Sequence, residues 1–169
     1  MKRHSPGRVN IKVIVILVSV VIVLVVGAFV ARHVRREYLS KQSLTAANAA
    51  YERQDWPEAC KHFVEYMHRN LDNPEVLRKY AKAVLSIEPL DNKQINKALW
   101  SYRRLLRIEP DDDPEICEKL AELYIYTNNL RELSYIAERV LEQEPQNVKA
   151  LLWRVKHLMA TGKKDKARE

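Results

Sequence analysis

Hydrophobic residues follow two different patterns along the chain. Residues 13–31 are apolar almost without a break, and only Ser19 and Gly27 interrupt them mildly. After Glu37 the apolar residues recur at helical spacing, and turns that contain proline separate the segments. No alternation typical of β-strands follows Glu37. The pattern therefore predicts an all-α chain, with one apolar N-terminal helix followed by a series of amphipathic helices.

The apolar segment has the length of a transmembrane helix. Residues 13–31 would rise about 28 Å as a helix, close to the thickness of the hydrocarbon core. Backbone groups in lipid need internal partners, so we expect this Val/Ile-rich run to be helical there. A cleavable secretory signal is the alternative, because the start is basic and the small residues 26–28 suit cleavage. We favour a retained anchor, because the run exceeds a usual signal core and the basic residues of 32–36 follow it at once.

The excess positive charge of the chain is concentrated around the apolar segment. The chain has 29 Lys+Arg and 22 Asp+Glu, a formal net charge of +7. Residues 1–36 hold seven of the basic side chains and no acid, so residues 37–169 are balanced. This distribution argues against nucleic acid as a partner of the body and predicts contact with the lipid bilayer through residues 13–31. It divides the N-terminal part into a basic tail (1–12), a transmembrane helix (13–31) and a basic juxtamembrane linker (32–39).

The basic residues on the two sides of the apolar segment do not by themselves decide the membrane orientation. Four basic residues flank each end of the apolar segment, within about fifteen residues: Lys2, Arg3, Arg8 and Lys12, then Arg32, Arg35, Arg36 and Lys41. A short charged tail resists translocation, whereas a long domain crosses largely regardless of its charge. We therefore favour a cytoplasmic N-terminus and an extracytoplasmic body.

Turns and small residues recur in the body at a regular interval. Pro74, Pro110 and Pro145 each close a helical segment, at spacings of 36 and 35 residues. A period near 34 residues is typical of two-helix repeats. Four units share small residues, aromatics and turn residues at comparable offsets: Ala46-Ala47, Asp55-Trp56, Ala59 and Phe63; Tyr80-Ala81, Ala98, Tyr102 and Leu105; Leu120-Ala121, Tyr124, Asn128-Asn129 and Ala137; Leu151, Leu158, Gly162 and Ala167.

On these residues, positions 40–169 resemble the tetratricopeptide repeat (TPR) family. The resemblance implies an α-solenoid of helix-turn-helix repeats, about three complete and a truncated fourth. The second unit departs by about five extra residues between its helices, and the first by about three before Pro74. The fourth has Arg154-Val155 where the family pattern has Leu-Gly, and it breaks off at Glu169. Because a stack needs a polar cap, we expect these 169 residues to begin a longer protein.

The resemblance also implies a partner-binding groove lined by the first helix of each unit. The family's groove positions fall on Asn48, Tyr51, Arg78, Lys79, Lys82, Glu118, Lys119, Glu122, Tyr126, Lys149, Trp153 and Lys156. Such a groove is basic with scattered aromatics, which suits an acidic or carboxylate-bearing segment; ordinary solvated charges are the alternative. The family's chaperone-binding members clamp a terminal carboxylate with Lys and Asn. Asn48 matches that clamp, but Leu44 and Glu115 replace expected lysines, so we do not expect a chaperone tail.

Candidate catalytic or metal-binding sets are weak. Three glycines form no phosphate-binding motif, and two cysteines form no disulfide framework or zinc knuckle. Cys60 and His62 would point about 160° apart on a helix, so they and His68 are expected to be structural. Cys117 falls at a packing position, and the acidic run 111–113 precedes a helix N-terminus, where carboxylates cap N–H groups. We expect no cofactor, no metal and no catalysis.

The leading hypothesis is therefore a membrane-anchored, non-catalytic scaffold or adaptor that binds a partner protein or peptide. Two alternatives stay open at this stage. The array is the membrane stalk of an enzyme whose catalytic domain lies beyond residue 169, or it is an import or chaperone receptor that faces the cytosol.

Overall fold

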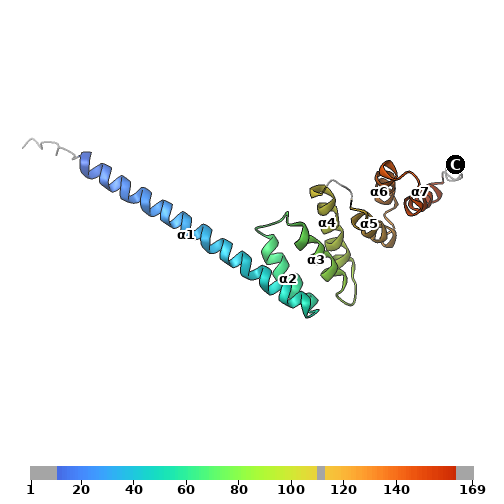
Figure 1. Ribbon diagram of the computed structural model, residues 1–169, viewed down its shortest axis with the longest axis horizontal. Helices are drawn as coiled ribbons and strands as arrows, with labels where there is room; N and C mark the ends of the chain where they lie inside the picture. The colour runs from blue at the N-terminus through green and yellow to red at the C-terminus, as the bar shows by residue number, and fades with distance from the viewer. Residues whose placement is uncertain (1–10, 110–112, 163–169) are drawn as a thin grey trace, which may run out of the picture. The chain divides into compact units, whose positions relative to one another are not determined.

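The computed structural model describes residues 11–109 and 113–162, with side chains from Leu17 onward, and this part of the chain is entirely helical. The helices are α1 (Ile11–Glu52), α2 (Trp56–Met67), α3 (Pro74–Leu85), α4 (Asn92–Ile108), α5 (Pro114–Tyr126), α6 (Leu130–Gln143) and α7 (Val148–Ala160) (Figure 1). The chain divides into two compact units, residues 1–42 and 43–169. The predicted all-α class is confirmed.

Helix α1 contains the predicted apolar segment. Its large apolar side chains from Leu17 to Val30 are exposed to the surroundings. Among the described residues, α1 is the one helix that is long and apolar enough to cross a membrane. Residues 32–39, expected to form a linker, are helical and continue α1 without interruption. Residues 1–10 of the expected basic tail lie outside the described part.

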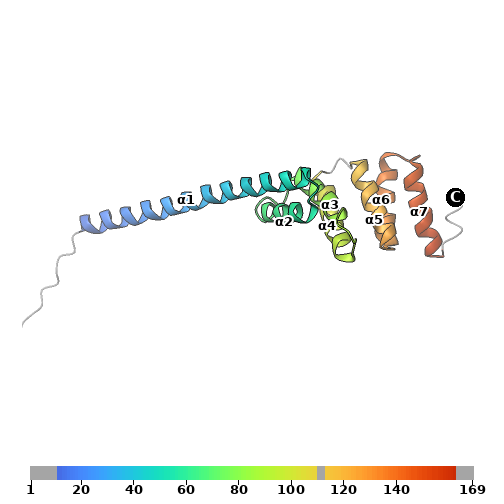
Figure 2. The same ribbon diagram turned by 90° about the horizontal axis from the view of Figure 1, so that it is seen from below.

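The second unit is built from helix pairs. The end of α1 (from Ser43) packs with α2, α3 packs with α4, and α5 packs with α6. Figure 2 shows α2 to α7 following one another in chain order. Helix α7 packs on α6 and begins a fourth pair; the expected second helix of that pair falls on residues 163–169, outside the described part.

Local sequence signals explain where the helices start. Pro74 and Pro114 occupy the first turns of α3 and α5, where the missing N–H costs nothing. The side chain of Asn73 caps α3 by accepting a bond from the Val76 N–H at 3.2 Å. Asp91 forms a reciprocal capping box at the start of α4. These signals fix the starts of α3, α4 and α5.

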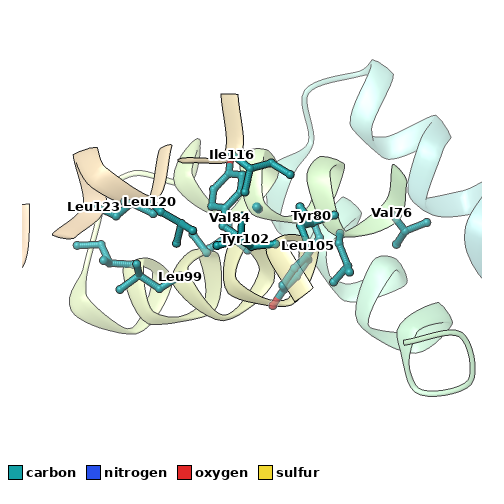
Figure 3. Packing of buried hydrophobic residues seen from close by; sticks show 14 of the residues in the cluster. Val76, Tyr80, Val84, Leu99, Tyr102, Leu105, Ile116, Leu120 and Leu123 are labelled. Carbon is teal, nitrogen blue, oxygen red and sulfur yellow. The ribbon is translucent and has the colours of Figure 1, made fainter. Parts of the chain in front are cut away.

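A continuous apolar core joins the successive pairs. Small residues are fully buried at the helix crossings, which lets the helices approach closely: Ala47, Ala50, Ala59, Ala81, Ala98, Ala121 and Ala137. Larger side chains fill the space between neighbours, and Figure 3 shows Val84, Tyr102, Leu105 and Ile116 meeting where α3, α4 and α5 come together. Each pair completes its core only against the next one, so stacking stabilises the array.

The extra residues of the second unit are divided between a loop and a helix. The loop between α3 and α4 spans residues 86–91, whereas the corresponding turns of the first and third units span only 53–55 and 127–129. Helix α4 has 17 residues, compared with 12 in α2 and 14 in α6. The insertion therefore lengthens α4 and adds a basic first turn to it.

Candidate functional site

The predicted groove residues lie on the first helices of the repeats, on the end of α1 and on α3, α5 and α7. We call these residues the first-helix face: Asn48, Tyr51, Arg78, Lys79, Lys82, Glu118, Lys119, Glu122, Tyr126, Lys149, Trp153 and Lys156. The structure brings some of them together across neighbouring repeats. Lys79 Nζ donates to Asn48 Oδ1 at 3.0 Å, and Lys149 Nζ donates to Glu118 Oε1. Both pairs join residues 31 apart, close to the repeat length, so positions of neighbouring units meet.

Arg78 is held by two carboxylates. Its guanidinium donates to both oxygens of Glu109, at 3.3 and 2.7 Å, and to Asp113 Oδ2 at 2.8 Å. The hydrogen bond to Asp113 raises the pKa of Arg78, and the same bond lowers the pKa of Asp113. One positive charge thus faces two negative ones. Arg78 was predicted to offer its charge to a partner in the groove. In the structure its guanidinium forms ion pairs with Glu109, at the end of α4, and Asp113, at the start of α5.

Two lysines of the first-helix face form ion pairs within their own helices. Lys79 Nζ also contacts Glu75 Oε1 at 2.8 Å, and its hydrogen bond lowers the pKa of Glu75. Lys119 Nζ contacts Glu122 Oε2 at 2.9 Å, and this bond raises the pKa of Lys119. These contacts leave little unbalanced positive charge at the middle of the first-helix face.

Lys82 and Lys156 are the cations of the first-helix face whose charge is not compensated. Both side chains are exposed, and neither has an ion pair with any residue in the described ranges. Lys82 lies near the end of α3, and Lys156 lies in the second half of α7. The available positive charge is therefore confined to two positions instead of spreading along the whole groove.

The aromatic residues of the first-helix face have different environments. Tyr51 packs edge-on against Trp56 and Phe63, with ring centroids 5.4 and 6.1 Å away, so it supports the core. Tyr126 is 65% exposed. Trp153 is half-buried beside a recess of about 300 Å³ between α5 and α7, which Cys117 and Val140 also line. Tyr126 and Trp153 offer apolar surface to a partner, whereas Tyr51 does so only in part.

The remaining candidates have structural surroundings. Burial raises the pKa of the half-buried Cys60 thiol to about 11, so the thiol stays protonated at neutral pH and is a poor nucleophile. His62 lies between Glu58 and Glu65 of its own helix, at 3.0 Å from each. Cys117 is buried. In residues 17–109 and 113–162, no three potential ligands are grouped as a metal site. Asp111 and Asp112 of the acidic run lie outside the described residues.

Two features of the structure were not predicted from the sequence. Glu109 was not recognised as a partner of Arg78, although the two residues are 31 apart, the same separation as Asn48 and Lys79. The basic residues of α4 were also missed, together with the exposed Trp100 among them. Their spacing along the helix was the available signal, because residues three and four apart share a face.

Stacked helix pairs that share one core define an α-solenoid protein, and the first helices of its pairs carry the charged and aromatic residues of the first-helix face. The Arabidopsis OM64 TPR domain is similar, with 18% identity over 74% of this chain and 98% of that one, at a TM-score of 0.50. This likeness shows the fold, so the predicted TPR-type solenoid is confirmed. Two further likenesses are the first TPR of Spaghetti (RPAP3) bound to an HSP90 peptide (19% identity, 73% of this chain and 95% of that one, TM-score 0.48) and MamA (14%, 76% and 86%, 0.43). No family model and no curated protein matches the sequence.

Proposed function

We propose that this chain is a membrane-anchored scaffold without catalytic activity, which binds a partner protein or peptide on the first-helix face. The observation that carries this proposal is the pair of uncompensated cations, Lys82 and Lys156, on the face that also presents Tyr126 and Trp153. Tyr and Trp are enriched among the side chains that anchor protein partners, and free ammonium groups form charge-assisted hydrogen bonds with carboxylates. The apolar part of α1 supports attachment to a bilayer.

The charges favour a partner segment with carboxylates. Lys82 and Lys156 offer ammonium groups that are free to form charge-assisted hydrogen bonds. Arg78 faces two carboxylates already, so a further acidic group near it would meet net negative charge. We therefore place the acidic contacts of the partner at the two lysines and its apolar contacts at Tyr126 and Trp153.

The cross-repeat contacts support a preformed surface. Lys79 with Asn48, Arg78 with Asp113, and Lys149 with Glu118 each link neighbouring repeats. Side chains that are ordered before binding lose less entropy when a partner arrives. These contacts support a first-helix face on which Arg78, Lys79 and Lys149 are ordered before a partner binds, while Lys82 and Lys156 stay available to it.

Charge reversal tests this proposal. Partners are captured with the full chain in neutral detergent and identified by mass spectrometry, and the affinity of a purified partner is then measured. We expect the double variant Lys82→Glu and Lys156→Glu to weaken binding at least about tenfold. The matched control carries Arg53→Glu and Arg154→Glu, two exposed arginines outside the first-helix face, which changes the net charge equally. Unchanged affinity in the first variant would refute binding on the first-helix face.

A further inference from the structure

A second concave surface lies between the second helices of the first two repeats. Val64 and Met67 of α2, Leu71 of the following loop and Trp100 of α4 line a recess of about 630 Å³. Tyr80 of α3 also lines it, and because this side chain is only 4% exposed it forms the floor. Leu71 and Trp100 are 40% and 42% exposed. We call this surface the α2–α4 recess; it has the size of a site for a large apolar side chain and its neighbours.

The recess borders a stripe of positive charge on α4. This helix carries five basic residues and no acid over its 17 positions. Lys93, Lys97, Trp100, Arg104 and Arg107 follow one another at intervals of 4, 3, 4 and 3 residues, so they lie on one face. The stripe extends about 21 Å along the helix axis. Such a length matches four turns of a bound helix or a short extended segment.

Three cations of α4 keep their charge uncompensated. Arg104 forms an ion pair with Asp72. Arg103 Nε donates a hydrogen bond to the Tyr124 hydroxyl at 2.7 Å, and the guanidinium lies over the Tyr124 ring, 5.2 Å from its centroid. The exposed Lys93, Lys97 and Arg107 have no ion pair within the described part of the chain. Lys93 and Lys97 line the α2–α4 recess.

Arg107 belongs to an adjoining hollow that prolongs this surface. This second hollow has a volume of about 830 Å³ and is lined by Trp100, Arg103 and Arg107 of α4 and by Asn128 of the turn between α5 and α6. Trp100 and Asn96 line both hollows, with Lys93 and Lys97 beside the first and Arg107 beside the second.

We infer that this surface of α4 binds an acidic peptide segment that carries a large apolar side chain. The apolar side chain fills the α2–α4 recess against Trp100, and carboxylates on either side of it contact Lys93, Lys97 and Arg107. Charge complementarity supports the acidic character of this partner, because α4 has no acid of its own to balance these cations. The recessed position of Val64, Met67 and Tyr80 favours an inserted side chain over a flat lipid surface.

This interaction is separate from the proposed role of the first-helix face. The α2–α4 recess uses none of the residues assigned to the first-helix face. A chain with both surfaces would hold two partner segments at once. The two proposals can consequently fail independently, because each has its own charge-reversal variant.

A designed peptide tests the inference. The probe is a fluorescein-labelled helical peptide of about 16 residues, long enough to cover the stripe, with leucines on one face and glutamates on the others. Both of its ends are capped, so that no terminal carboxylate takes part. With the full chain in neutral detergent, we expect saturable binding in a fluorescence anisotropy titration. Lys93→Glu with Lys97→Glu should raise the Kd about tenfold or more, and Trp100→Ala should raise it by a similar factor.

Control probes and variants test separately the charge of the peptide, its apolar side chains and the folding of the protein. A probe with Gln in place of Glu and a probe with Ser in place of Leu should each lose binding. Arg53→Glu with Arg154→Glu, at two exposed arginines that line neither hollow, should leave the Kd unchanged. Circular dichroism checks that each variant is folded, and Trp100→Phe should retain most of the affinity. The inference is overturned if the probe does not bind, or if the α4 variants bind it as the parent does. Binding of phosphatidylserine vesicles that depends on Lys93 and Lys97, without peptide binding, would also overturn it in favour of a lipid surface.

Discussion

Arg78 shows how a single residue changes role between sequence and structure. In the sequence it is one of several basic residues at groove positions, and Glu75, three residues earlier, is the candidate partner that helical spacing offers. In the fold it reaches Glu109 and Asp113, which are 31 and 35 residues away. The three side chains are 31–39% exposed, so solvent screens their charges. We therefore expect the ion pairs to contribute about 1 kcal/mol to the free energy of unfolding.

The Asp113→Asn variant isolates the charge of this cluster. Asp113 also caps α5, accepting a bond from the Glu115 N–H at 2.9 Å, and Asn is an equally good capping residue. We expect the variant to lower the free energy of unfolding by about 1 kcal/mol at neutral pH. The hydrogen bond to Arg78 lowers the pKa of Asp113 from its ordinary 3.8. The ionic contribution is therefore fully present above that value and is lost as the pH falls through the lower pKa of the folded state.

Urea unfolding of both proteins at neutral and strongly acidic pH measures this difference. The gap between parent and variant should close at pH values below the folded pKa of Asp113, because both side chains are then neutral. An equal gap at both pH values would show that the Asp113→Asn substitution disturbs the cap or the packing, and that the charge contributes nothing measurable.

At the scale of the element, α4 combines a strong local start signal with an unusual surface. Asp91 Oδ1 accepts from the Gln94 N–H at 2.7 Å, and Gln94 Oε1 accepts from the Asp91 N–H at 2.6 Å. This capping box satisfies two backbone donors at the end of the inserted loop. It therefore holds the first turn of α4, which carries Lys93.

Replacement of Asp91 by Ala should destabilise this turn. We expect the free energy of unfolding to fall by about 1 kcal/mol, because a capping side chain is lost. Hydrogen exchange at the amides of residues 92–96 should become faster, while exchange in α6 is unchanged. Lys93→Ala is the matched control, since it alters an exposed neighbour without a capping role, and its effect should stay within about 0.5 kcal/mol. Unaltered exchange at the start of α4 in Asp91→Ala would contradict this role of the capping box.

The helices were largely predictable from the sequence because their causes are local. Apolar periodicity, Pro74 and Pro114 at helix starts, and side chains such as Asn73 act within a few residues. The division of the inserted residues between a loop and a longer α4 was not predictable, because both outcomes satisfy the same pattern. Residues 32–39, predicted as a basic juxtamembrane linker, contain no helix-breaking residue, and α1 runs through them.

At the scale of the whole molecule, the proposed membrane attachment rests on the apolar part of α1. The double variant Val21→Arg and Leu24→Arg introduces two charges into residues 13–31 of the full chain, each costing about 2.5–3.5 kcal/mol on insertion scales. We expect the parent chain to stay in the membrane pellet after alkaline carbonate extraction, and the variant to move substantially into the supernatant. Val34→Arg with Tyr38→Arg, just outside the apolar segment, should behave as the parent.

The same preparation distinguishes an anchor from a signal. A retained anchor leaves the mature N-terminus ahead of residue 13, whereas N-terminal sequencing that starts shortly after residues 26–28 would show cleavage. For the favoured orientation, protease added from the cytoplasmic side should leave the repeats intact. Digestion of the repeats from that side would reverse the proposed orientation.

The sequence by itself determined the all-α class, the apolar segment and the two-helix repeat, because each depends on periodicity and composition that are read along the chain. Only the tertiary structure decided which side chains pair across the repeats. Lys79, Arg78 and Lys149 find their partners 31 to 35 residues away, and those distances close only when the repeats stack in one particular register. Stacking pairs Arg78 and Lys149 with carboxylates of other repeats, whereas Lys79 and Lys119 are paired within their own helices. Lys82 and Lys156 stay without an ion pair in the described residues, and the cations of α4 lie around Trp100.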